Sequence, residues 1–155
     1  MVRPRKQRKI FTGLCVFALV FVSPSFAEND VKMIGTSQLH SMVVDNVYEL
    51  EAGRQGQFAI IDARPREEYE RAHIFSAISI PIKDFEKLKD LLPKDREALL
   101  VVYCDDTKSE TSRTWAGKAT GLGYANIVVY SESFSAWRKS KMPIVPLKAA
   151  FDDLR

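Results

Sequence analysis

The segment that decides the fold is Leu99-Leu-Val-Val-Tyr-Cys104. An unbroken apolar run of this kind, rich in β-branched and aromatic side chains, predicts a strand that is buried on both faces. After Cys104 the chain is polar, and residues 110–122 then show helical spacing that closes at Gly121 and Gly123. A buried strand that runs through a polar turn into a helix is typical of α/β proteins with a parallel sheet.

Short apolar runs and helical stretches alternate on both sides of this segment. Further strands are expected at Phe58-Ala-Ile-Ile61, Ala77-Ile-Ser-Ile80 and Ile127-Val-Val-Tyr130. Helices are expected at residues 34–46 with a Thr36 cap, 65–71, 83–92, 110–122 and 133–139. The sequence therefore predicts an α/β fold with a mostly parallel central sheet of about five short strands flanked by helices on both faces.

Residues 1–27 differ from the rest of the chain. They contain a basic start, an apolar run over residues 10–22 and the small-residue pair Ser25-Phe-Ala27, which is the plan of a secretory signal peptide. The apolar run is shorter than the ~20 residues that a membrane-spanning helix needs. We therefore expect cleavage after Ala27, a periplasmic or secreted protein, and no stable membrane insertion afterwards. An uncleaved signal anchor is the alternative.

Removal of the signal changes the charge of the chain. It takes away five of the 23 basic residues and none of the 20 acidic ones, so the mature charge is 18 − 20 = −2. No basic stripe with interleaved aromatic residues remains, which excludes nucleic acid as an expected partner. The other 128 residues suit one domain. We expect a helical extension over 28–57, the main domain over 58–146 and a tail over 147–155.

Cys104 is the one cysteine left after cleavage, because Cys15 lies in the signal. A lone thiol in an exported protein is buried and inert, pairs with another molecule, or is reactive. Cys104 ends a predicted parallel strand, where α/β proteins place their ligands, and it precedes a helix whose amino end favours a thiolate. We therefore regard Cys104 as the candidate nucleophile. The candidate active-site loop consists of Asp105, Asp106, Thr107, Lys108, Ser109, Glu110, Thr111 and Ser112.

Four segments in order resemble the rhodanese-like domain family, over about residues 58–146. They are Ile60-Ile-Asp62-Ala-Arg64 with the acidic residues after it, Ala72-His73-Ile74 with Ala77 to Pro81, Val101-Val-Tyr-Cys104 with the helix ending at Gly121-Leu-Gly-Tyr124, and Phe134-Ser-Ala-Trp137. The resemblance implies a sulfurtransferase in which Cys104 accepts a sulfur atom as a persulfide and passes it to an acceptor. It implies no metal and no cofactor. It also implies structural roles for Asp62, Arg64, His73 and Trp137.

The loop departs from the pattern of the family it resembles. The family's usual glycine is missing, the loop or helix start is about two residues longer, and Ser112 matches the family serine. Asp105, Asp106 and Glu110 outweigh Lys108, which leaves a net charge of −2 near the thiol. This charge opposes a thiolate and repels dianionic thiosulfate. The expected partners are therefore a neutral, cationic or protein-borne sulfane-sulfur donor and a protein thiol acceptor.

Two other functions are alternatives to sulfur transfer. Phosphatases of the related cysteine-x5-arginine type need an arginine six positions after the cysteine, where this chain has Glu110, so that activity is not expected. The remaining alternative is a catalytically weak module that binds a protein partner or senses redox state, with Cys104 kept for packing. The sequence leaves sulfur transfer and partner binding open.

Overall fold

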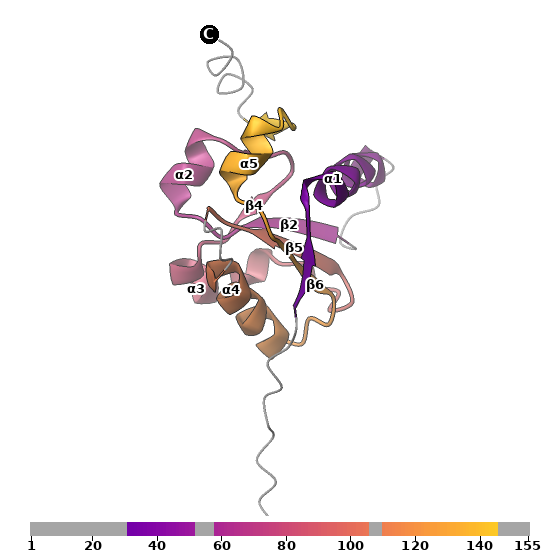
Figure 1. Ribbon diagram of the computed structural model, residues 1–155. Helices are drawn as coiled ribbons and strands as arrows, with labels where there is room; N and C mark the ends of the chain where they lie inside the picture. The colour runs from indigo at the N-terminus through magenta and orange to yellow at the C-terminus, as the bar shows by residue number, and fades with distance from the viewer. Residues whose placement is uncertain (1–30, 52–57, 106–109, 146–155) are drawn as a thin grey trace, which may run out of the picture.

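The computed structural model describes residues 31–51, 58–105 and 110–145 (Figure 1). Within them, the central sheet has five strands in the order β1-β6-β5-β2-β4, and every neighbouring pair is parallel. The strands are β1 (Lys32–Ile34), β2 (Phe58–Asp62), β4 (Ile78–Ser79), β5 (Leu99–Tyr103) and β6 (Ile127–Tyr130). The predicted α/β fold with a mostly parallel sheet of about five strands is thereby confirmed.

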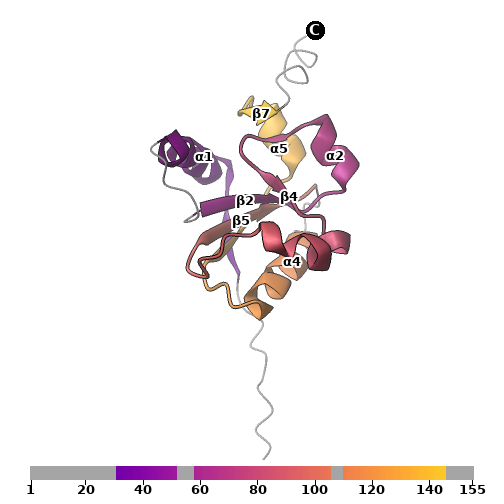
Figure 2. The same ribbon diagram turned by 180° about the vertical axis from the view of Figure 1, so that it is seen from behind.

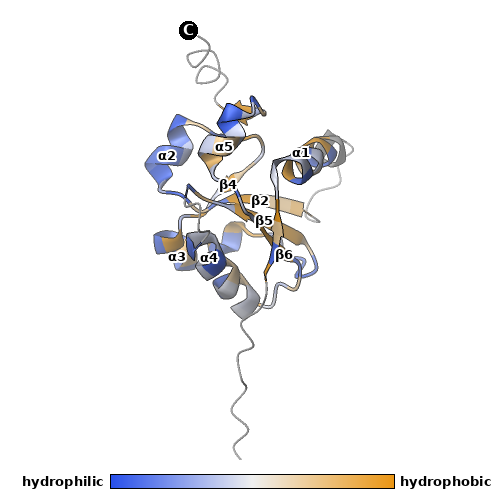
Figure 3. Cartoon of the chain, viewed as in Figure 1, coloured by the Kyte–Doolittle hydropathy of each residue, from blue (hydrophilic) through white to orange (hydrophobic). Residues whose placement is uncertain are grey.

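Strand β5 lies in the middle of the sheet. Its whole length pairs with β2, from Phe58 opposite Leu99 to Asp62 opposite Tyr103, and β6 pairs along its other side. Both of its faces are covered, because Leu100 to Tyr103 are completely buried. This burial is why β5 is a continuous apolar run rather than an alternating one. The coloured ribbon in Figure 3 shows the same concentration of hydrophobic residues in the central strands.

Helices cover both faces of the sheet, as Figures 1 and 2 show from opposite sides. One face carries α1 (Thr36–Glu51), α2 (Arg66–Arg71) and α5 (Phe134–Lys139), and the other carries α3 (Phe85–Leu88) and α4 (Glu110–Gly121). Each face has its own hydrophobic core. Trp137 of α5 is fully buried in the first core, and Trp115 of α4 in the second.

The expected helix over 34–46 is partly wrong, because Ile34 belongs to strand β1 and α1 begins at Thr36. Strand β1 has three residues and pairs with β6, so it forms one edge of the central sheet. Leu39 and Val43 of α1 pack into the first core. The described part of the segment expected as a helical extension is therefore integrated into the same folded unit.

Two other elements differ from the expectation. The helix expected over 83–92 is divided into η1 (Ile82–Asp84), α3 and η2 (Lys89–Leu91). A second, two-stranded antiparallel sheet pairs β3 (His73–Ile74) with β7 (Ile144–Val145). Strands of two residues carry no periodic signal, which is why the sequence did not reveal them. The described residues include no helix long and apolar enough to cross a membrane, and the expected signal segment 1–27 lies outside them.

Candidate active site

Cys104 lies at the carboxyl end of β5, the central strand of the sheet. Its residue surface is 4% exposed. The backbone N–H of Phe134, the first residue of α5, donates a hydrogen bond of 3.2 Å to the Cys104 carbonyl oxygen. One residue earlier, the Tyr103 carbonyl accepts a 3.0 Å bond from the N–H of Ala63. The backbone around the candidate nucleophile is therefore held by both β2 and α5.

A cavity of about 300 Å³ opens beside Cys104, which we call the thiol cavity. It is lined by Ala63, Arg64, Pro65, Pro81, Ile82, Lys83, Cys104, Asp105 and Thr111. These residues come from the carboxyl ends of β2, β4 and β5 and from the first turn of α4, which is the edge of the sheet where ligands of open α/β proteins bind. The volume is at the lower end of the range for small-molecule sites.

A buried polar network lies directly behind this cavity. Arg64 donates from Nη2 to Asp62 Oδ2 at 2.7 Å and from Nε to Asp62 Oδ1 at 3.0 Å, and both side chains are at most 2% exposed. The Tyr103 hydroxyl donates to the same carboxylate, and the Ile74 N–H donates to the Tyr103 oxygen. Arg64 Nη2 also donates to the Ala72 carbonyl oxygen. The network joins β2, β3 and β5 just below the cysteine.

Burial and charge shift the pKa values in this network. Burial raises the pKa of Tyr103 well above its ordinary value, and the negative charge of Asp62 adds to the effect. Burial acts to lower the pKa of Arg64, but the hydrogen bond and the charge of Asp62 outweigh it, so this pKa is raised. Arg64 and Tyr103 are therefore a permanent cation and a neutral phenol at physiological pH, which fits structural roles.

Arg64 and Asp105 separate the thiol cavity from a second hollow. The second hollow measures about 160 Å³ and is lined by Arg64, Glu68, Arg71, Ala72, Asp105, Phe134, Ser135 and Arg138. Arg64 Nη1 lies 3.7 Å from Asp105 Oδ2, and the guanidinium carbon stacks 3.8 Å from the Phe134 ring centroid. Burial raises the pKa of Asp105, although the charge of Arg64 acts in the opposite direction.

The structure describes half of the expected active-site loop. Asp106, Thr107, Lys108 and Ser109 lie outside the described residues, and Asp105 is exposed at the cavity edge. Glu110 begins α4 and is exposed, whereas Thr111 lines the thiol cavity. The Ser112 side chain is fully buried, and its hydroxyl has no hydrogen-bond partner among the described residues.

His73 and Trp137 lie away from the thiol cavity lining. Nδ1 of His73 is 2.8 Å from the Tyr69 carbonyl oxygen, and the His73 ring stacks on the Tyr69 ring at 3.7 Å between centroids. Trp137 is fully buried, and its indole N–H donates to the Pro143 carbonyl oxygen. Neither side chain is placed to act on Cys104, because neither lines the cavity.

The sequence did not identify Pro65, Pro81, Ile82 or Lys83 as parts of the site. Pro81, Ile82 and Lys83 directly follow the predicted strand at 77–80. This position could have indicated their role, since ligand sites lie beyond the carboxyl ends of strands. Which strand neighbours β2 is a property of the sheet order, however, and that order is a tertiary feature. Among the described residues, no group of three or more His, Cys, Asp or Glu side chains is arranged to hold a metal ion.

Glu132 has a structural role away from the cavity. Its carboxylate accepts hydrogen bonds from the N–H and the hydroxyl of Thr36 at 3.2 and 2.8 Å, which caps the start of α1. Its neighbour Ser133 caps α5 by accepting from the Ala136 N–H. Glu132 and Ser133 thus fix the starts of two helices.

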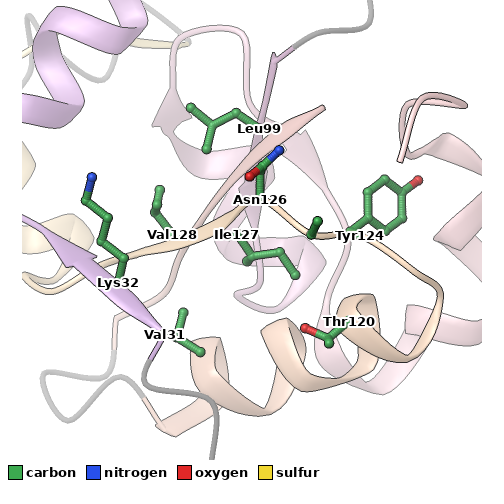
Figure 4. Close-up of a pocket in the computed structure, with 9 residues that line it drawn as sticks. Val31, Lys32, Leu99, Thr120, Tyr124, Asn126, Ile127 and Val128 are labelled. Atoms are coloured by element: carbon green, nitrogen blue, oxygen red, sulfur yellow. The ribbon is translucent and has the colours of Figure 1, made fainter. Parts of the chain in front are cut away.

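A third cavity, of about 580 Å³, lies at the opposite end of the sheet (Figure 4). Its lining includes Val31, Lys32, Leu99, Tyr124 and Ile127, which mark the amino ends of β1, β5 and β6 and the turn before β6. Lys32 is the one charged residue in this lining, and no nucleophilic thiol is present there. The larger volume therefore does not make it the better candidate for chemistry.

Comparison with known proteins identifies the fold independently. The model of the rhodanese-like domain matches residues 45–140. A full-length protein from Lactobacillus plantarum is 17% identical with a TM-score of 0.57, covering 72% of this chain and 85% of its own. A rhodanese-like domain from Anabaena is 22% identical with a TM-score of 0.53, covering 72% of this chain and 76% of its own.

A thiosulfate sulfurtransferase from Pseudomonas aeruginosa also shares the fold, with 17% identity and a TM-score of 0.58. The match covers 74% of this chain but 20% of that enzyme. A search among curated proteins gave no match. At these identities the structural likeness defines a sulfurtransferase-like fold and leaves the activity to be argued from the site.

Proposed function

Because the chain belongs to the rhodanese-like domain family, we propose that it is an exported sulfurtransferase or persulfide carrier that acts through Cys104. The observation that carries the proposal is the position of Cys104 in the wall of the thiol cavity, at the carboxyl end of β5 and beside the first turn of α4. A sulfur donor in this cavity would meet the thiol and the amino end of a helix together.

The proposed reaction is a transfer of neutral sulfur between thiolates. The Cys104 thiolate attacks the outer sulfur of a donor persulfide, forming an S–S bond to Sγ while the bond between the outer and inner donor sulfurs breaks. The electron pair of the broken bond leaves with the donor thiolate. An acceptor thiolate then attacks the outer sulfur of the Cys104 persulfide and restores the Cys104 thiolate. No external oxidant or reductant is required.

The rigidity of the site supports this chemistry. The backbone hydrogen bonds to Tyr103 and Cys104 hold the strand end, and the Asp62–Arg64–Tyr103 network lies behind it. A nucleophile on a fixed strand end needs little reorganisation when a donor binds. Because Cys104 is buried, we expect that it is reached by small donors or by a protein thiol that extends through the cavity.

Export is the second part of the proposal, and it rests on residues 1–27. The test is to express the full chain in a bacterium and to determine the amino-terminal residue of the protein in the periplasmic fraction. We expect Glu28 as the first residue. Retention of residues 1–27 in the membrane fraction would instead identify an uncleaved signal anchor.

Sulfur transfer is tested by intact-mass spectrometry of the mature protein before and after incubation with thiosulfate, 3-mercaptopyruvate and glutathione persulfide. We expect the gain of one sulfur from at least one donor, its removal by cyanide, and no gain in Cys104→Ser. A folded protein that gains no sulfur from any donor would favour the partner-binding module. Sulfur gained equally by the Cys104→Ser variant would show that Cys104 is not the acceptor.

A further inference from the structure

Lys83 is a cation in the lining of the thiol cavity. It lies in η1, directly after the end of β4, and its side chain is exposed. Half of the other eight lining residues are apolar, namely Ala63, Pro65, Pro81 and Ile82. The lining thus combines apolar walls and the thiol with three charged residues, Arg64, Lys83 and Asp105.

The other cation of the cavity lining, Arg64, is already paired with carboxylates. Arg64 is bound through two nitrogens to Asp62, and its third terminal nitrogen faces Asp105 at 3.7 Å. Asp84, the neighbour of Lys83, lies 3.8 Å from Lys87 instead. Among the described residues, Lys83 makes no ion pair. Its charge is therefore available to a ligand.

The backbone that carries Lys83 is fixed on the sheet. The N–H of Ile80 donates to the Asp62 carbonyl oxygen, and its own carbonyl accepts from the indole N–H of the buried Trp115, both at 3.0 Å. The N–H of Asp84 then closes a tight turn by donating to the Pro81 carbonyl oxygen at 2.9 Å. The rigid turn thus holds the backbone of Lys83 in the lining of the thiol cavity.

We propose that Lys83 is the specificity-determining residue of the thiol cavity, and that it selects a small organic sulfur donor carrying one anionic group. This inference deepens the proposed function and rests on it. The cavity of about 300 Å³ accommodates a short apolar segment between the reacting sulfur and a carboxylate or sulfonate. The proposal differs from the expectation from loop charge alone, which favoured neutral or cationic donors.

The test measures the charge selectivity of Cys104 with two thiosulfonate reagents of similar size. One is the anionic 2-sulfonatoethyl methanethiosulfonate, and the other is the cationic 2-(trimethylammonio)ethyl methanethiosulfonate. Both form a disulfide with the Cys104 thiolate and release methanesulfinate. The ratio of the two rate constants cancels any change in the amount of thiolate, so a change in the ratio reports a change in the electrostatic potential at the thiol.

We expect Lys83→Gln to lower the ratio of anionic to cationic rate constants by about three- to tenfold, and Lys83→Glu to lower it further. Lys83→Arg should keep the ratio. Lys87→Gln is the matched control, because Lys87 carries the same charge, lies four residues after Lys83 and does not line the thiol cavity. This variant should leave the ratio unchanged.

An unchanged ratio in Lys83→Gln would overturn the inference. So would an equal fall in Lys87→Gln, which would indicate general surface charge, or a fall confined to Lys108→Gln, which would assign the selectivity to the loop. Because the reagents need only a reactive thiol, the result is independent of sulfur transfer. If the wild-type protein gains no sulfur but Lys83 still controls the ratio, the proposed function fails and the anion selectivity stands.

Discussion

The Tyr103 hydroxyl lies 2.6 Å from Asp62 Oδ2, although the two residues are 41 positions apart in the sequence. This hydrogen bond joins the carboxyl ends of β2 and β5, which are neighbours in the sheet. Cys104 follows Tyr103 directly. The position of the candidate nucleophile is therefore coupled to a buried carboxylate through the hydrogen bond of its neighbour Tyr103.

Removal of the Tyr103 hydroxyl should destabilise the protein. Tyr103→Phe leaves the Ile74 N–H without its acceptor and Asp62 Oδ2 with one donor fewer. We expect a loss of about 1–3 kcal/mol in the free energy of unfolding, measured by urea denaturation. Tyr124→Phe is the control, because that hydroxyl donates to a backbone carbonyl oxygen, that of Pro93, and not to a buried carboxylate. An equal loss in both variants would contradict a special role for the Asp62 network.

Removal of the Asp62 charge should be more damaging. Asp62→Asn removes the buried counter-ion of Arg64 and leaves it the half-exposed Asp105 carboxylate at 3.7 Å. Breaking a buried pair in this way costs about 3–5 kcal/mol. Glu70→Gln removes a charge from an ion pair with Arg66 in which both side chains are more than half exposed, so a much smaller loss of stability is expected. Chemical denaturation of both variants provides the measurement. Similar losses would mean that Arg64 is solvated.

Asp105 should make stability depend on pH. Its pKa is raised by burial, so its contribution to stability is fully present below about pH 4 and is lost as the pH rises through the folded-state pKa. Asparagine has no such titration. The stability of Asp105→Asn relative to wild type should therefore increase as the pH rises from about 3 to 7. The partial exposure of Asp105 keeps the change small.

Urea midpoints across this pH range provide the measurement for Asp105. Asp90→Asn serves as the control, because it changes the net charge equally at an exposed residue of η2. The stability of Asp90→Asn relative to wild type should not show the same increase with pH. A stability of Asp105→Asn that falls relative to wild type with rising pH would show that the attraction of Arg64 outweighs burial.

Ser112→Ala should stabilise the protein. The hydroxyl is fully buried and has no hydrogen-bond partner in the described part of the chain, so its removal takes away an uncompensated desolvation cost. A gain of about 1 kcal/mol in the free energy of unfolding is expected, and Ser79→Ala, the other buried serine of this kind, provides an independent comparison. Thermal and urea denaturation report the effect. A clear loss of stability in Ser112→Ala would mean that the hydroxyl is satisfied in solution.

Several parts of this structure are local properties and could be predicted from the sequence. Strand β5 was predicted with its observed bounds, because a run of five consecutive apolar residues has the length of a buried strand and is too short for a buried helix. Strand β6 was predicted for the same reason, and α4 closed at Gly121, with Gly123 adopting the positive φ of 93° that a glycine permits. The position of Cys104 at a strand end followed from the same patterns.

The sequence by itself thus determined the fold class, the central strands and the identity of the candidate nucleophile, because each depends on the order of residues along the chain. Only the tertiary structure decided which strand lies beside β2, and with it the walls of the thiol cavity. Lys83 enters the site because β4 pairs with β2, and Tyr103 meets Asp62 because β5 pairs on the other side. Such contacts depend on sheet order, and no local pattern of residues encodes that order.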